Sequence, residues 1–263
     1  MIVFGAVVPH SPLLIPTVGK QHRDTLAKTL ASFVTLEESL YLAKPDSICL
    51  IAPHGPRYPD AFSINLADKY AGSLKSFGDH STTVSAKSDY LLIDHIQRQL
   101  RQENVPFTLT SSEELDYGYT VPLFLLTEKL RSWKLIPVSP SNHDGNAHFE
   151  FGRHLKRTLH ADTHRVAIIA SADLSHALTK NAPAGEHPEG VVFDEAVRLA
   201  ISEQDPRKLL ALSPEKIEAA SQCGYRPILT LFGALDGVNM TSKILSYEAP
   251  FGVGYITAQF DIG

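Results

Sequence analysis

A strand-like run that ends in proline and histidine constrains the fold of this chain more than any other feature. Within residues 47–55, five consecutive apolar residues include two β-branched isoleucines. Such a run is typical of a strand that is buried on both faces in a parallel sheet. Pro53 and Gly55 end the strand, because proline cannot donate to a ladder and glycine tolerates unusual dihedral angles. We therefore expect His54 just past the carboxyl end of a central strand, where open α/β sheets bind ligands.

The chain begins with the same pattern, since residues 2–8 are largely apolar and Pro9 and His10 follow them. Two such strands in one sheet would place His10 and His54 on the same rim. Imidazole groups bind Zn, Cu, Fe and Ni, so the pair predicts part of a metal site. The chain has 12 histidines, so chance is the alternative explanation for two Pro-His pairs.

A third apolar run, residues 166–170, leads to Asp173 and His176. Asp173 either orients His176 or caps the next turn through its carboxylate. Glu248 follows a later strand and is a candidate third ligand, with a solvated turn as the alternative. Two imidazoles and one carboxylate form the facial triad of non-haem Fe(II) oxygenases, and the same ligands hold Zn²⁺ in hydrolases.

Apolar spacing predicts an α/β fold: a single domain over residues 1–263, with a mixed, mostly parallel central sheet and helices on both faces. A helix at 23–43 joins the first two strands in a βαβ unit. The predicted strands at 243–247 and 254–260 pair at the end of the sheet, and residues 62–67 form an edge strand followed by polar loop to about residue 86. The other predicted helices span 89–102, 121–126, 149–159, 193–201, 205–220 and 225–235.

Composition excludes several classes of protein. The net charge of −5 argues against a partner that is a nucleic acid or an anionic membrane. No apolar run reaches the length of a membrane span, and the N-terminus lacks the pattern of a secretory signal. With only Cys49 and Cys223, a disulfide framework is excluded and a reducing, cytoplasmic location is expected.

Short motifs occur in a fixed order along nearly the whole chain. They are Pro9-His10-Ser11-Pro12, Pro53-His54-Gly55, Asp116-x-Gly118 followed by Val121-Pro122-Leu123, Ser171-Ala172-Asp173-Leu174-Ser175-His176, and Tyr247-Glu248 with Gly252-x-Gly254-Tyr255. Each motif is weak alone, but the ordered set is specific. The set resembles the class III extradiol ring-cleavage dioxygenases, of the protocatechuate 4,5-dioxygenase β-subunit type, and their Memo-like relatives.

The resemblance implies that His10, His54 and Glu248 bind Fe(II), with Zn or another divalent metal as the alternative. It also implies that His176 is the acid/base group that takes a proton from a bound diol, a task suited to imidazole. The implied substrates are O₂ and a small catechol-like or aminophenol-like aromatic compound. Family members often form homodimers or pair with a second subunit.

The sequence departs from the family pattern at Tyr117, where a histidine commonly precedes the Val-Pro-Leu segment. Tyrosine is a much weaker acid than histidine near neutral pH, so either the substrate differs or ring opening is altered. Tyr119 is a candidate to compensate, as a substrate contact. His187 is either a substrate contact at the mouth of the cleft or a surface residue.

A second resemblance points to the Memo-like branch, whose dioxygenase activity is doubtful. Cys223-Gly224-x-x-Pro227 is similar to a segment of that branch. Cys223 is either a reactive thiol near the site or a half-buried structural residue. Arg226 either pairs with an acidic substrate or caps a helix. His143 and His148 flank a turn and are expected in solvent. The alternative function is therefore a metal-binding or redox module without ring cleavage.

Overall fold

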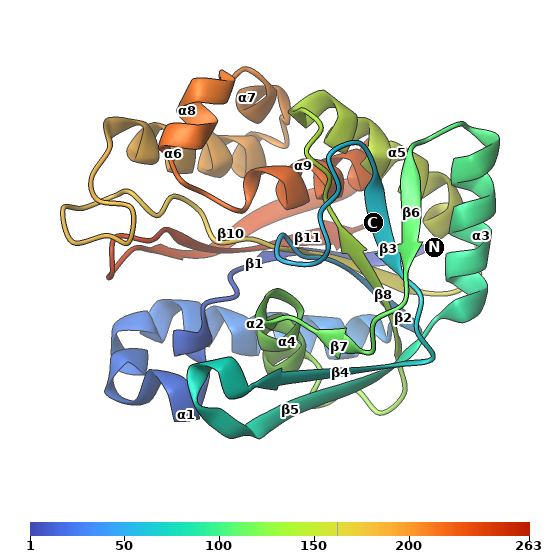
Figure 1. The fold of residues 1–263 in the computed structure, drawn as a ribbon, viewed down its shortest axis with the longest axis horizontal. Coiled ribbons are helices and arrows are strands. Elements are labelled where there is room, and N and C mark those ends of the chain that lie inside the picture. Colours follow the sequence, from blue (N-terminus) through green and yellow to red (C-terminus); the bar gives the residue numbers. More distant parts are fainter. Residues whose placement is uncertain (162) are drawn as a thin grey trace.

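The structure, a computed structural model, describes residues 1–161 and 163–263. A single sheet runs through these residues, in the order β10-β11-β1-β9-β2-β8-β5-β4-β7, and β3 and β6 branch from β8 (Figure 1). The strands are β1 Ile2–Val8, β2 Ser47–Ile51, β3 Phe62–Asn65, β4 Lys69–Leu74, β5 Asp79–Ser88, β6 Phe107–Thr110, β7 Glu114–Leu115, β8 Lys134–Ser139, β9 Val166–Ser171, β10 Met240–Glu248 and β11 Tyr255–Ile262.

The centre of the sheet is parallel, since β1 pairs with β9, β9 with β2, and β2 with β8 in that sense. The pairs of β10 with β11 and of β11 with β1 are antiparallel at one edge, and β4 and β5 are antiparallel toward the other. The carboxyl ends of neighbouring parallel strands lie at the same edge of a sheet, so the segments that follow β1, β2 and β9 lie together. This arrangement confirms the predicted mixed, mostly parallel sheet.

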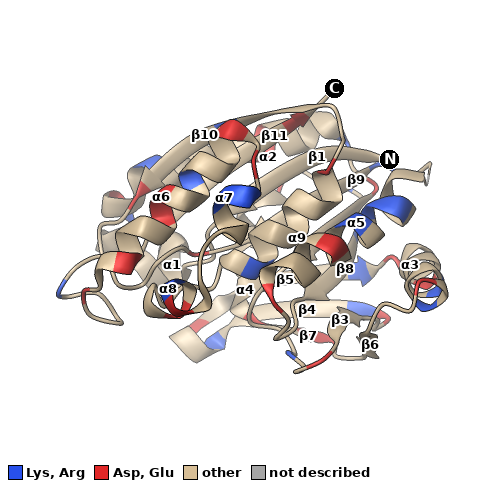
Figure 2. Ribbon diagram, turned by 90° about the horizontal axis from the view of Figure 1, so that it is seen from above, with Lys and Arg blue, Asp and Glu red and all other residues tan. Residues whose placement is uncertain are grey.

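Helices cover both faces of the sheet (Figure 1). They are α1 Pro16–Gly19, α2 Ala27–Ala43, α3 Tyr90–Gln102, α4 Tyr117–Leu126, α5 Gly145–Ala161, α6 Pro188–Glu203, α7 Arg207–Leu210, α8 Pro214–Ala219 and α9 Tyr225–Leu235, with 3₁₀ turns at Pro12–Leu14, Lys20–Leu26 and Lys75–Phe77. One apolar core joins α3, α5, α6 and α9 to the sheet, and a second joins α2 and α4 to the other face. Charged residues of both signs are spread over the outer helices and loops (Figure 2).

Three expectations about the fold were wrong. The strand β3 is not an edge strand, because it pairs with both β6 and β8. The segment expected to be polar loop is the β4–β5 hairpin, whose alternating residues Tyr70, Val84 and Ala86 are buried. Serine and threonine on the outer face of this hairpin hide its alternation in the sequence. Pro122 lies in the interior of α4, which begins earlier, at Tyr117.

The helices α5 and α9 pack with their backbones in contact. A Cβ atom placed on Gly152 would lie 2.1 Å from the carbonyl oxygen of Thr230, and one on Gly233 would lie 1.9 Å from that of Phe149. Only glycine permits so close an approach. This contact fixes the position of α9, and with it the turn that precedes α9 on the rim of the sheet.

Candidate metal centre

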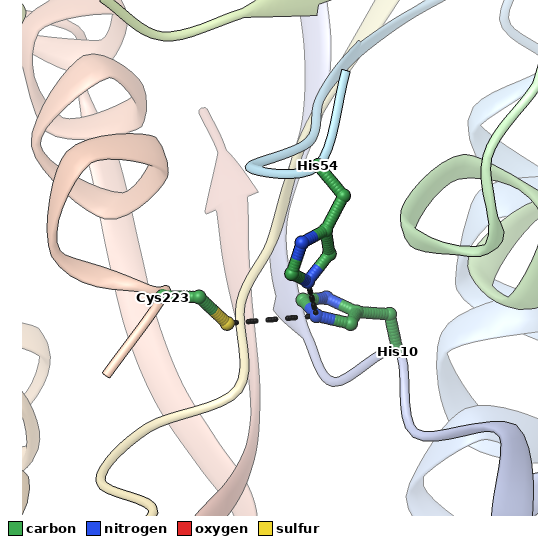
Figure 3. A group of neighbouring side chains, drawn as sticks. All are labelled: His10, His54 and Cys223. Atoms are coloured by element: carbon green, nitrogen blue, oxygen red, sulfur yellow. Dashed lines mark hydrogen bonds between the residues drawn. The ribbon is translucent and has the colours of Figure 1, made fainter. Parts of the chain in front are cut away.

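Three side chains with metal-binding atoms converge on this rim: His10 after β1, His54 after β2, and Cys223 just before α9 (Figure 3). The Nε2 atoms of His10 and His54 are 3.1 Å apart, and the Sγ atom of Cys223 is 3.5 Å from Nε2 of His10. All three ligand atoms lie within 4.8 Å of one another. Two imidazoles and a thiol form a donor set for Zn, Cu or Fe, so the residues fit a bound transition metal.

The hydrogen bonds of His10 determine which of its nitrogens is free to bind an ion. Ser171 Oγ donates to the carbonyl oxygen of Gly118 at 2.6 Å, which uses its only proton. The Nδ1 atom of His10 lies 2.9 Å from the same Oγ and must therefore donate to it. This leaves Nε2 of His10 unprotonated and directed at the other two ligands, an arrangement common for metal-binding histidines.

Burial keeps both imidazoles neutral, the form that binds metals. His10 is fully buried, and burial together with the nearby His176 lowers its pKa to about 3. Partial burial and His10 also lower the pKa of His54, whose ring is more exposed. Burial raises the pKa of the Cys223 thiol. A bound cation would reverse this last effect, because metals coordinate the thiolate.

Tyr117 lies against His54 on the open side of this group. Its hydroxyl is 2.9 Å from Nε2 of His54, and the two rings stack with centroids 4.6 Å apart. Burial raises the pKa of Tyr117 to about 12, so the phenol stays protonated at neutral pH. Tyr117 therefore places a protonated hydroxyl next to Nε2 of His54, whose single lone pair would be used by a bound ion.

Asp173 is placed beside the histidine pair by the segment after β9. Its Oδ1 atom accepts a hydrogen bond from the backbone nitrogen of His10 at 2.9 Å, and its Oδ2 atom lies 3.8 Å from Nε2 of His10. Burial raises the pKa of Asp173. His176 is half-buried, and its Nε2 atom has no partner among the described residues. Its charge would lower the pKa of His10, His54 and Asp173, which places His176 in the same electrostatic environment.

The structure does not bring Glu248 to the histidine pair. Its Oε1 atom accepts hydrogen bonds from the backbone nitrogen of Thr29 at 2.8 Å and from the hydroxyl of Thr29 at 2.6 Å. Thr29 lies in the first turn of α2, so Glu248 caps this helix from another element. The ladder of β10 and β11 shifts register between Ile244 and Ser246, and such a bulge redirects the side chains that follow.

The two residues expected to contact substrate lie in different surroundings. Tyr119 is buried, and its hydroxyl donates to the carbonyl oxygen of Val138 at 2.8 Å. His187 is exposed and caps α6, where its Nδ1 accepts from the backbone nitrogen of Glu189. His148, expected in solvent, is fully buried against Phe62 because α5 begins earlier than its apolar spacing suggests.

The resemblance implied His10, His54 and Glu248 as ligands and did not include Cys223. The signal in the sequence is the Cys-Gly-x-x-Pro segment at the start of α9, because a helix start on the rim of the sheet points its first residues at the strand ends. Cys49, the other cysteine, is buried in β2, where burial raises its pKa to about 12.

Comparison with known proteins decides the family. The family described as the catalytic LigB subunit of aromatic ring-opening dioxygenase matches residues 5–258. The chain belongs to this family. The resemblance stated from the ordered motifs is thereby confirmed, and the match includes the segments that carry His10, His54, Asp173, His176 and Cys223.

Two relatives add to this assignment. Protein CA_C1420 of Clostridium acetobutylicum is 26% identical over 258 residues, which cover 95% of this chain and 55% of that protein. The chain thus spans about half the length of this curated relative. The crystal structure of the uncharacterized protein JW3007 from Escherichia coli K12 has a TM-score of 0.65 at 16% identity, over 99% of this chain and 100% of that one. This second likeness shows the shared fold.

None of the helices in the described part of the chain is long and apolar enough to cross a membrane.

Proposed function

We propose that this protein is a metal-dependent oxidoreductase whose ion is bound by Nε2 of His10, Nε2 of His54 and Sγ of Cys223. The observation that carries the proposal is the convergence of these three atoms within 4.8 Å on the rim of the sheet. Imidazole and thiolate ligands suit Cu, Zn and Fe, and thiolate favours the softer ions among them. This proposal corresponds to the Memo-like alternative that the Cys223-Gly224-x-x-Pro227 segment suggests.

The neighbouring residues support this use of the site. Ser171 fixes the tautomer of His10, and Asp173 holds the backbone of His10 in place. A bound ion would supply Lewis-acid or redox chemistry and a common position for two reactants. Tyr117 places its hydroxyl at the exposed side of His54, and His176 is the candidate carrier of a substrate proton.

The second candidate function is Fe(II)-dependent extradiol cleavage of a catechol-like or aminophenol-like ring by O₂. The family match favours it, as does Nε2 of His176, which lacks a hydrogen-bond partner in the described part of the chain. Against it stand the thiol of Cys223 in place of a carboxylate, and Tyr117 in place of the usual histidine. We therefore rank ring cleavage below redox chemistry at a site with two histidines and one cysteine.

Metal analysis tests the proposal directly. The protein is purified without added metal, and its metal content is measured beside the variants Cys223→Ala and Cys49→Ala. We expect the metal to be lost in Cys223→Ala and retained in Cys49→Ala, because Cys49 lies inside the sheet. Equal metal content in the two variants would rule out Cys223 as a ligand.

Oxygen consumption distinguishes the two candidate functions. After anaerobic loading with Fe(II), the protein is mixed with a panel of catechols and aminophenols in air. Ring cleavage predicts a coloured product and steady O₂ uptake that is lost in His176→Ala. The redox module predicts metal binding without such a product.

A further inference from the structure

A cavity of about 700 Å³ lies beside the turn that carries Cys223, and none of the three candidate ligands is among its described lining residues. Residues that flank Cys223 in the sequence, Gln222 and Arg226, form part of its wall. Leu212 and Ile217, from the segment of α7 and α8, add an apolar side. A volume of this size is in the range that small-molecule ligands occupy.

Two nitrogen atoms in the wall of this cavity are buried without a hydrogen-bond partner among the described residues. They are Nε of Arg226, at the start of α9, and Nε2 of His143, in the loop before α5. A buried polar atom without a partner is costly, and the cost is higher for a charged guanidinium. Such atoms are therefore expected to have a ligand or water as their partner.

The positive charge of Arg226 is not balanced by a carboxylate. Within residues 1–161 and 163–263, no salt bridge to Arg226 or Arg57 is formed. Burial and, second, the neighbouring Arg57 lower the pKa of Arg226. Like charges repel, and an anion bound at Arg226 would offset this repulsion.

Two acidic residues also line the cavity, but neither neutralises this charge. Asp144 is exposed, and its Oδ1 atom accepts a hydrogen bond from the backbone nitrogen of Ala147 as the cap of α5. Glu218 is exposed on α8. The cavity is therefore positive at Arg226, while its exposed charged residues, Asp144 and Glu218, are acidic.

We infer that this cavity binds a small molecule that carries an oxyanion group, with the anion at Arg226 and an apolar body against Leu212 and Ile217. A carboxylate and a phosphate share the geometry that a guanidinium recognises through two parallel hydrogen bonds. His143 donates or accepts one further hydrogen bond. That this molecule is the substrate of the adjacent metal centre rests on the proposed function, whereas binding of the anion itself does not.

Calorimetric titration with two probes, benzoate and inorganic phosphate, tests the inference on the protein as purified. We expect saturable binding of a probe that is weakened roughly tenfold or more in Arg226→Gln, because a charge-assisted hydrogen-bond pair is lost. Arg226→Lys should bind more weakly than the wild type and more tightly than Arg226→Gln. The matched control is Arg131→Gln, which changes an exposed arginine outside the cavity.

The outcomes separate the cavity from the metal centre. Preference for benzoate identifies a carboxylate ligand, and preference for phosphate identifies a phosphate ligand. Metal content in Arg226→Gln should match that of the wild type, and benzoate binding should persist in Cys223→Ala. The inference is overturned if neither probe binds, or if Arg226→Gln remains folded in thermal denaturation and binds as tightly as the wild type. Binding that is lost in Cys223→Ala but kept in Arg226→Gln would place benzoate on the metal and also overturn it.

Discussion

Replacing Glu248 by alanine tests whether this residue caps a helix or binds the metal. Its Oε1 atom accepts two hydrogen bonds from Thr29, at 2.8 and 2.6 Å, and Thr29 is fully buried. Among the described residues, no other side chain is seen to cap the start of α2, where Leu26 stands at the N-cap position. Glu248→Ala would therefore leave two donors in the first turn of α2 without partners.

The size of the effect follows from these contacts. Loss of an N-cap costs about 0.5–2 kcal/mol, and hydrogen bonds to a charged group contribute about 1.5–3 kcal/mol each. Because Glu248 is half-exposed and water would replace part of the loss, we expect a decrease of about 2 kcal/mol in the free energy of unfolding. For a protein of this size this corresponds to a fall in melting temperature of roughly 4–8 °C.

Thermal denaturation and metal analysis of the same samples provide the assay. We expect Glu248→Ala to melt at lower temperature with unchanged metal content, and Glu248→Gln to lie between it and the wild type. Glu128→Gln, at an exposed position, is the control for a change of one charge. If Glu248→Ala loses its metal while its melting temperature stays that of the wild type, our reading of Glu248 is refuted and the carboxylate is a ligand.

Three further predictions concern the site and its support. Ser171→Ala removes the acceptor that fixes the tautomer of His10. Metal affinity, measured by competition with a chelator, should therefore fall by roughly 10–100-fold. An unchanged affinity would contradict this role of Ser171. Burial raises the pKa of Asp194 to about 6, so the folded state holds this proton more tightly than the unfolded state. The free energy of unfolding should therefore decline by up to about 3 kcal/mol as pH rises from about 4 to 6, and urea titrations should show that Asp194→Asn lacks this part of the decline. Gly233→Ala forces a Cβ atom against the backbone of α5 and should lower stability by about 1–3 kcal/mol or more in urea denaturation, with equal stability as the refuting result.

The sequence predicted those parts of the fold whose signals are local. Continuous apolar runs identified β1, β2 and β9, because strands in the centre of a parallel sheet are buried on both faces. Apolar residues at helical spacing identified α3 and α9. The β4–β5 hairpin was missed because only one of its faces is buried, and the serine and threonine residues of the other face resemble a loop.

The site was predictable to the extent that it follows from strand ends. His10 and His54 each follow a central strand directly, so the sheet alone brings their rings together. The Glu248 side chain depends on the register of β10, and a shift of one residue exchanges the two faces of a strand. No spacing rule in the sequence reports such a shift.

The position of Cys223 beside the histidine pair depends on long-range packing, which the Cys-Gly-x-x-Pro segment alone does not specify. Cys223 lies two residues after Ser221, which has a positive φ of 50°. It precedes α9, whose position is set by the contact of Gly152 and Gly233 with the opposite backbones. The same helix start presents Arg226 to the neighbouring cavity. Because Cys223 and Arg226 both lie at the start of α9, a ligand held at Arg226 would be positioned relative to an ion at Cys223 by that one helix start. Chemistry at the metal centre and recognition of an anion would then be coupled by the placement of a single helix.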